Sequence, residues 1–380
     1  MSTSSHQVGI NAHLLSRQAG YRSAGVHGYI HNLLLRLPAV EQGANLHYTI
    51  YRGTGPPEPG ERMAIVRSRW PTGRPWVRIL WEQLALPWQR MDLLHSTAFI
   101  TPLISPWPTV ITVYDLSFLH YPAAFTPGRQ AYLRLFAQLS CRRAQRVIAI
   151  SQSTRRDLVR QWKLPAAKID VAYPGVGGQF RPLPAAELNA FRVRRGLPER
   201  FILALGTLQP RKNLVRLVQA YGRLRAQGAK TKLVLAGGKG WLYQEILAEI
   251  ERLNLDNDVI LPGFVPDNEL ALWYNAAALL AYPSLYEGFG LPVVEAMACG
   301  TPVVSSNVSS MPEAAGSAGL LVDPHNTEAL ANALHRALTE AALREEMQAK
   351  GLAQAARFSW TGTAAATVAA YQRVLGEQTL

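Results

Sequence analysis

Short apolar runs that alternate with helical periods constrain the fold more than any other feature of this sequence. In the second half, such runs predict strands at 201–205, 232–236, 259–261, 277–282 and 301–305. Amphipathic segments between them predict helices at 214–227, around 242–253, at 268–275 and at 292–299. Buried strands without polar alternation, each followed by a helix, are typical of a parallel sheet with helices on both faces.

The first half alternates less regularly, with strands predicted at 7–11, 47–51, 109–114 and 147–150 and helices near 26–37 and 129–145. A loop is expected at 53–60, and glycines and prolines at 174–184 separate the two patterns. A chain of 380 residues also exceeds what one core usually supports. We therefore expect an α/β protein of two doubly wound, Rossmann-like parallel-sheet domains, 1–178 and 179–360, facing a central cleft. Phe358 and Trp360 are expected to anchor a C-terminal helix at 361–380 that packs back on the first domain.

Cysteine content and hydropathy restrict the class of protein. Cys141 and Cys299 are far apart, which excludes a disulfide scaffold and zinc-finger spacing and suits a reducing compartment. The polar N-terminus shows no signal-peptide pattern, and no apolar stretch approaches the ~18 residues needed to span a bilayer. We expect a soluble, cytoplasmic protein that can lie peripherally on the inner face of the plasma membrane.

The positive charge is concentrated in the first half of the chain. Residues 1–190 hold 21 Lys and Arg against 9 Asp and Glu, whereas residues 191–380 hold 18 against 17. An excess of this size implies a nucleic acid, an acidic membrane or a phosphorylated acceptor as partner, although a plain solubility bias would also produce it. No nucleic-acid-reading motif is present, so we expect no nucleic acid partner. Residues 67–90 interleave tryptophan with arginine, which suits a membrane interface, while core packing of Trp81 is an equal alternative.

The strongest candidate site follows the strand predicted to end at Tyr282. Gly288 and Gly290 would let backbone amides approach a ligand, and a helix beginning near Pro292 would add its positive dipole for a phosphate. Glu287 and Glu295 could each bind a vicinal diol, one on a sugar and one on a ribose. Either carboxylate alone could instead be solvated or complement the helix dipole.

A second candidate follows the strand at 201–205. The loop from Gly206 to Asn213 carries Arg211 and Lys212 before a helix that Asn213 could cap. A guanidinium fork and an ammonium group suit a diphosphate, and such cations stabilise a leaving group by about 3 kcal/mol per donor.

With these motifs the chain resembles the retaining glycosyltransferases of family 4, which have two Rossmann-like domains in the GT-B arrangement. Residues 263–324 and the loop 210–213 carry the resemblance, and Glu287 and Glu295 match the family's E-x7-E motif. Residues 284–292 and 299–304 resemble the branch of mannosyltransferases that builds O-antigens. Weaker similarities start at Trp81, Val113, Ile150 and Tyr173 and extend the resemblance over nearly the whole chain.

The resemblance implies a role for each matching position. Glu287 would bind hydroxyls of the donor sugar, Glu295 the ribose, and Arg211 and Lys212 the diphosphate. Other donor-binding positions would be Gly25, which borders the phosphate and the acceptor, Val265, whose backbone meets the base, and Gly206, Gly288, Phe289, Gly290 and Leu291.

One position departs from the family pattern. Many relatives carry histidine immediately before the aspartate that is Asp115 here, near the reacting centre, and this chain has Tyr114. A phenol can donate a hydrogen bond to a sugar hydroxyl, but it is uncharged near neutral pH and bulkier. His27, His95 and His120 are weaker candidates to replace the histidine.

Other signals predict no chemistry of their own. The segment 256–258 (Asp-Asn-Asp) imitates a metal-binding DxD motif but falls in a helix-to-strand turn, where these residues are common, so we expect no metal. The glycines at 237–240 lack the Walker pattern, and no GxGxxG follows the first strand, so ATP and nicotinamide cofactors are not expected.

The combined expectation is a metal-independent, retaining hexosyltransferase that needs no cofactor. We expect it to transfer mannose from GDP-mannose to a glycan or lipid-linked acceptor in cell-surface polysaccharide synthesis. No nucleophile with an adjoining base is present, so we expect same-face displacement in which the departing phosphate takes the acceptor proton. A GT-B epimerase or hydrolase acting on the nucleotide sugar, or a catalytically silent sugar-nucleotide binding protein, remain the alternatives.

Overall fold

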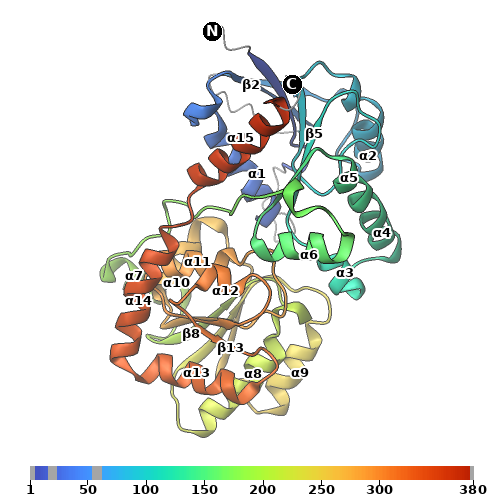
Figure 1. The fold of residues 1–380 in the computed structure, drawn as a ribbon. Helices are drawn as coiled ribbons and strands as arrows, with labels where there is room; N and C mark the ends of the chain where they lie inside the picture. Colours follow the sequence, from blue (N-terminus) through green and yellow to red (C-terminus); the bar gives the residue numbers. More distant parts are fainter. Residues whose placement is uncertain (1–4, 16–23, 54–61, 377–380) are drawn as a thin grey trace. The chain divides into compact units, whose positions relative to one another are not determined.

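The computed structural model describes residues 5–15, 24–53 and 62–376, which form two compact units (Figure 1). The first unit contains the chain up to Gly175 together with the segment from Trp360, and the second runs from Val176 to Ser359. None of the helices in these described ranges is long and apolar enough to cross a bilayer.

The first unit is built on a seven-stranded, fully parallel sheet of order β3-β2-β1-β4-β5-β6-β7. Its strands are β1 (His6–Asn11), β2 (Leu46–Arg52), β3 (Met63–Arg67), β4 (Leu93–Ser96), β5 (Thr109–Val113), β6 (Arg146–Ala149) and β7 (Ile169–Val171). Its α-helices are α1 (Ala24–Arg36), α2 (Pro75–Leu84), α3 (Ser117–His120), α4 (Pro127–Tyr132), α5 (Gln138–Arg143), α6 (Gln152–Trp162) and α15 (Trp360–Gly376). Single-turn 3₁₀ helices are η1 (Leu37–Ala39), η2 (Glu41–Gly43), η3 (Leu86–Trp88), η4 (Pro122–Ala124) and η6 (Ala166–Lys168).

The second unit has a six-stranded parallel sheet of order β10-β9-β8-β11-β12-β13. Its strands are β8 (Phe201–Leu205), β9 (Lys232–Ala236), β10 (Val259–Gly263), β11 (Leu279–Tyr282), β12 (Val303–Ser306) and β13 (Leu320–Val322). Its helices are α7 (Ala185–Arg195), η7 (Pro210–Lys212), α8 (Leu214–Ala226), α9 (Gln244–Arg252), η8 (Asp267–Glu269), α10 (Leu270–Ala276), α11 (Leu291–Ala298), α12 (Met311–Ala315), α13 (Thr327–Thr339) and α14 (Ala341–Ala355). Helices α8, α9 and α13 cover one face of this sheet through a single apolar core (Figure 1).

Both sheets confirm the predicted doubly wound α/β class. The predicted strands are present within two residues at most ends, but β3, β4, β7 and β13 were not predicted. Edge strand β3 has a four-residue apolar run but is largely exposed, and β4 has only four residues, of which two are polar, so neither has the pattern of a long buried strand.

Several local predictions need correction. The helix expected at 129–145 consists of α4 and α5 joined by a π-helical segment, η5 (Leu133–Ala137). Gly25, which the resemblance places beside the phosphate and the acceptor as part of a loop at 23–28, is the second residue of α1. Ser23, residues 54–60 of the expected loop and residues 377–380 lie outside the described residues.

The C-terminal segment belongs to the first unit. Helix α15 packs against α1 (Figure 1). The rings of Tyr29 and Trp360 meet edge-on between these helices, with their centroids 5.7 Å apart. The Tyr371 hydroxyl lies 2.6 Å from Nδ1 of the fully buried His95, whose Nε2 contacts the Thr112 hydroxyl at 2.8 Å. Burial lowers the pKa of His95 to about 3, so His95 is a neutral core residue that joins the sheet to α15.

Glycines allow three strand-end loops of the second unit to touch. Gly237 has φ 153°, and a Cβ there would lie 2.0 Å from the carbonyl oxygen of Gly206. The Gly237 amide donates to the carbonyl of Gly263, the last residue of β10, and the Gly206 amide donates to the carbonyl of Ala236, the last residue of β9. The carboxyl ends of β8, β9 and β10 therefore come together only because position 237 is glycine. A side chain there would collide with the backbone of Gly206.

We predict that Gly237→Ala destabilises the protein by about 2 kcal/mol or more, because the methyl group meets a backbone oxygen and the φ angle is unfavourable. Urea unfolding followed by circular dichroism measures the loss. Gly178→Ala is the matched control, since open space surrounds that position. Equal midpoints for the two variants would contradict the predicted clash.

Candidate active site

The candidate site lies at the carboxyl edge of the second sheet, where the loops after β8 and β11 meet. The Leu285 amide donates to the Arg211 carbonyl at 2.9 Å and joins these loops. The Asn213 side-chain amide donates to the carbonyl oxygens of Pro283 and Pro324, at 3.2 and 2.7 Å. Asn213 has φ 59° and makes no capping hydrogen bond, so the predicted N-cap is wrong and the residue ties three loops together instead.

Glu287 is at the centre of a compact charge cluster. Its carboxylate oxygens lie 2.7 Å from Nη1 of Arg211 and 2.6 Å from Nζ of Lys212, and only 11% of its side chain is exposed. Burial alone would raise the pKa of Glu287, but the two cations lower it to about 2. The Glu287 carboxyl group is therefore ionised at neutral pH.

Backbone and aromatic groups hold the two cations in position. Nη1 of Arg211 also donates to the Tyr286 carbonyl at 2.5 Å. Nζ of Lys212 donates to the Tyr282 hydroxyl and lies 4.5 Å from the centre of that ring. The flanking Gly206 is close to this chain, because a Cβ there would lie 3.2 Å from Cε of Lys212.

Serines after β12 fix the backbone of Glu287. The hydroxyls of Ser309 and Ser310 donate to its carbonyl at 2.7 and 2.8 Å, and its amide donates to the Ser309 hydroxyl at 3.1 Å. Ser305 and Ser306 similarly donate to the carbonyls of Tyr282 and Ser284. Sequence reasoning missed these serines, although four hydroxyls within 305–310, directly after a predicted strand, were a usable signal.

The glycine loop after Glu287 leads into α11, as predicted. Gly290 has φ 104° and precedes the first residue of the helix, Leu291, while Phe289 packs on Phe358 at 5.0 Å. Val265 is buried beyond β10. Gly288 connects the charge cluster to the helix N-terminus, whose partial positive charge favours a phosphate.

Glu295 lies on the second turn of α11 and forms no ion pair among the described contacts. Its Oε2 accepts a hydrogen bond from the Tyr274 hydroxyl at 2.8 Å. Burial raises the pKa of Glu295 to about 7, and the Tyr274 hydrogen bond opposes part of this rise. Glu295 and Glu287 therefore differ in charge behaviour, because only Glu287 has cationic partners.

Gly25, Tyr114 and Asp115 belong to the first unit. Tyr114 is buried, and its hydroxyl donates to the Thr97 carbonyl at 2.8 Å instead of facing a ligand. The expected use of this phenol on a sugar hydroxyl therefore finds no support in the structure. Asp115 accepts from the Ser117 amide at the start of α3, and Gly25 is exposed on α1.

The histidines considered in place of Tyr114 have other surroundings. His120 lies 3.7 Å from the Asp157 carboxylate, and His27 stacks with His31 at 6.0 Å. His95 is in the core, as described above.

A second polar cluster, not predicted from the sequence, lies after β1 in the first unit. The Asn11 side chain donates to Glu82 on α2 at 3.1 Å, and its oxygen lies 3.0 Å from Nδ1 of His13. Arg78 approaches Glu82 at 3.8 Å. Burial followed by the Arg78 charge lowers the pKa of His13 to about 4, and burial raises the pKa of Glu82. Such a cluster offers donors and acceptors suited to hydroxyl groups.

No metal site is indicated in the described parts of the chain, where no group of three or more His, Cys, Asp or Glu could hold an ion. Asp258, of the segment that imitates DxD, pairs at 3.0 Å with both Arg225 and Lys232. The Asp258 carboxylate therefore forms structural ion pairs in the turn before β10.

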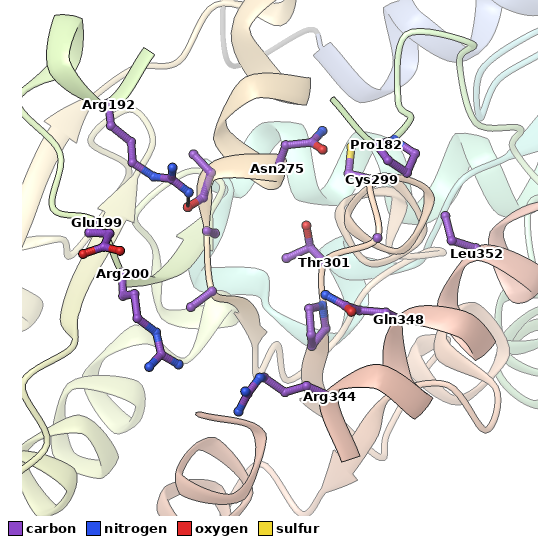
Figure 2. Close-up of a pocket in the computed structure, with 15 residues that line it drawn as sticks. Pro182, Arg192, Glu199, Arg200, Asn275, Cys299, Thr301, Arg344, Gln348 and Leu352 are labelled. Atoms are coloured by element: carbon purple, nitrogen blue, oxygen red, sulfur yellow. Dashed lines mark hydrogen bonds between the residues drawn. The ribbon is translucent and has the colours of Figure 1, made fainter. Parts of the chain in front are cut away.

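A cavity of about 560 Å³ lies at the opposite, amino edge of the second sheet (Figure 2). Its lining includes Arg192, Arg200 and Arg344. Arg200 and Arg344 both donate to the Leu338 carbonyl in the last turn of α13, and Arg192 donates to the Ala276 carbonyl at the end of α10. These arginines donate hydrogen bonds to carbonyl groups at the C-terminal ends of α10 and α13, which is a structural role.

Comparison with known proteins identifies the family of the chain. The family model "Glycosyl transferases group 1" matches residues 187–354, and "Glycosyltransferase Family 4" matches residues 23–177. The chain is 35% identical to O-antigen chain mannosyltransferase B of Escherichia coli over 69% of this chain and 70% of that protein. It is 32% identical to the serotype-specific mannosyltransferase WbdA of Escherichia coli, but spans only about a third of that protein's length. A D-inositol 3-phosphate glycosyltransferase of Nocardioides is 36% identical over 62% of this chain and 55% of that protein.

Solved structures show the same fold. Sucrose-phosphate synthase of Thermosynechococcus elongatus matches with a TM-score of 0.73 at 22% identity, covering 98% of this chain and 100% of that one. WaaG, a glycosyltransferase involved in lipopolysaccharide biosynthesis, matches with a TM-score of 0.70 at 18% identity, covering 97% and 99%. The two parallel-sheet units thus define a GT-B glycosyltransferase. The chain belongs to glycosyltransferase family 4 and is a retaining hexosyltransferase.

The raised pKa of Glu295 predicts a pH-dependent stability. A carboxyl group whose folded pKa is about 7 and whose ordinary value is 4.5 favours folding below about pH 4.5, and this contribution is lost as pH rises through 7. We predict that Glu295→Gln becomes more stable relative to the wild type between about pH 5 and pH 8. Urea midpoints across this range measure the difference. Glu345→Gln, at an exposed site on α14, should show no such trend.

Proposed function

We propose that the protein transfers mannose from GDP-mannose, with retention of configuration and without a metal, to a glycan or lipid-linked acceptor in cell-surface polysaccharide synthesis. The observation that carries the proposal is the Arg211–Lys212–Glu287 cluster beside the N-terminus of α11. It combines two cations for a diphosphate with one carboxylate for sugar hydroxyls. The 35% identity to an O-antigen mannosyltransferase supports mannose as the sugar.

In the proposed reaction, the bond between the anomeric carbon and the β-phosphate oxygen breaks. The acceptor oxygen bonds to the anomeric carbon on the same face, and the departing diphosphate takes the acceptor proton. Arg211 and Lys212 would stabilise the negative charge that develops on the leaving group. Glu287 would orient the hexose, and Glu295 would bind the ribose. Because Glu287 pairs with both cations in this structure, donor binding would exchange part of these contacts for the diphosphate.

We predict that Glu287→Gln lowers kcat by about 100-fold or more with GDP-mannose and a lipid-linked acceptor, because the carboxylate that positions both cations and sugar is lost. Radiolabelled mannose transfer measures the rate, and circular dichroism verifies that the variant folds. Glu345→Gln, which exchanges the same groups at an exposed site, should retain wild-type turnover. Wild-type turnover by Glu287→Gln would exclude the proposed role.

The donor assignment has its own test. We predict that GDP-mannose raises the melting temperature of the wild type more than UDP-glucose or a dTDP-sugar does, because a ligand stabilises the folded state it binds. Lys212→Met should abolish the shift by removing a charge from the diphosphate site. A larger shift with a UDP-sugar would contradict GDP-mannose as the donor while leaving glycosyl transfer intact.

Two results would favour the other activities considered. Conversion or hydrolysis of GDP-mannose without any acceptor would indicate an epimerase or hydrolase. Donor binding by calorimetry without transfer to any acceptor, including an inositol phosphate, would indicate a silent binding protein.

A further inference from the structure

Helix α2 of the first unit has two different apolar faces. Val77 and Trp81 are buried, and the Trp81 ring packs on His13 at 4.3 Å. Trp76, Leu80 and Leu84 recur every four residues and are 60%, 43% and 58% exposed. Residues at this spacing share one side of a helix. Therefore α2 buries one stripe in the unit and presents a second stripe of large apolar side chains outward.

Two further large apolar side chains near α2 are exposed. Trp88, in η3, is 74% exposed, and Ile104 is 77% exposed on a neighbouring loop. The Gln83 side chain holds this loop against α2 by accepting from the Leu103 amide at 3.0 Å and donating to the Thr101 carbonyl at 3.3 Å. We call Trp76, Leu80, Leu84, Trp88 and Ile104 the α2 face. A cluster of exposed large apolar residues of this kind marks an interaction surface.

Arginines border the α2 face along the chain. The stretch 62–92 contains six arginines against two acidic residues, Glu82 and Asp92. The Glu82 carboxylate turns inward and accepts from Asn11, so it adds little negative charge to the outer surface. Arginines at 67, 69, 74 and 90 are exposed. Tryptophan and leucine flanked by arginine match the interface of an anionic bilayer, where rings enter the headgroup region and guanidinium groups meet phosphates.

We propose that the α2 face docks the first unit on an anionic membrane surface. A second copy of the chain fits this face less well, since a symmetric contact would bring the arginines of both copies together without carboxylates to pair them. This inference deepens the proposed function and rests on it, because docking would serve the transfer of mannose to a lipid-linked acceptor. The inner side of α2 carries Arg78 and Glu82 of the polar cluster after β1, so docking would bring a lipid-linked acceptor close to that cluster.

Vesicle flotation of the full chain tests this inference. We predict binding to phosphatidylcholine vesicles with roughly one third phosphatidylglycerol, weak binding to pure phosphatidylcholine, and weaker binding at high salt. The double variant Trp76→Ser/Trp88→Ser should bind the anionic vesicles at least about 10-fold more weakly. Val193→Ser, which removes an 83% exposed apolar residue from the second unit, should bind like the wild type.

Unchanged vesicle binding by the double variant would overturn the proposal, and so would equal binding to both kinds of vesicle. A concentration-dependent dimer in sedimentation that the double variant abolishes, without vesicle binding by the wild type, would assign the α2 face to a second copy and also overturn it. The measurement needs no donor or turnover. Vesicle binding without mannose transfer would therefore refute the proposed function alone, and transfer to a soluble acceptor without vesicle binding would refute the docking alone.

Discussion

The ion pairs of Glu287 with Arg211 and Lys212 are the interaction on which the candidate site depends. A nearly buried carboxylate is costly unless it is paired and hydrogen-bonded, and here both oxygens have a cationic partner within 2.7 Å. The same contact connects the loops after β8 and β11, and serines after β12 hold the Glu287 backbone. One charge cluster thus organises three strand ends. Removing Glu287 would take away the carboxylate that both cations share, and removing either cation would leave Glu287 with one cationic partner instead of two.

This arrangement follows from the parallel sheet. All six strands of the second unit point the same way, so their following loops gather at one edge. Glycines bring the backbones of these loops into contact, and Asn213 binds two loop carbonyls at once. The opposite edge holds a cavity of about 560 Å³, but its arginines are used by helix ends.

The first unit uses several polar residues for its own architecture. His95 connects the sheet to α15, and Tyr114 donates to a strand-end carbonyl. The residues after β1 form a different polar cluster, in which burial keeps His13 largely neutral near neutral pH. Helix α2 links this cluster, on its inner side, to the apolar stripe on its outer side. Helix α2 therefore contributes both to a polar cluster and to an exposed apolar surface.

The sequence by itself determined the α/β class, most strands of both sheets, and the family, because apolar periodicity and strand-to-helix loops are local properties of the chain. It also marked Glu287, Glu295, Arg211 and Lys212 as site candidates through their place beside glycine loops. The short strands β3 and β4 were not predicted by the same reasoning. Both are short, and each pairs in parallel with a neighbouring strand of the first sheet.

Only the tertiary structure decided which partner each polar group has. Glu287 and Glu295 look alike in the sequence, yet one meets two cations and ionises readily, while the other meets a tyrosine and keeps its proton up to about pH 7. Tyr114 and Asn213 were assigned to a ligand and to a helix cap, and their actual partners are carbonyls of distant segments. Such partners are set by tertiary packing, since residues 17 and 111 positions apart in the chain become neighbours only when the sheets form.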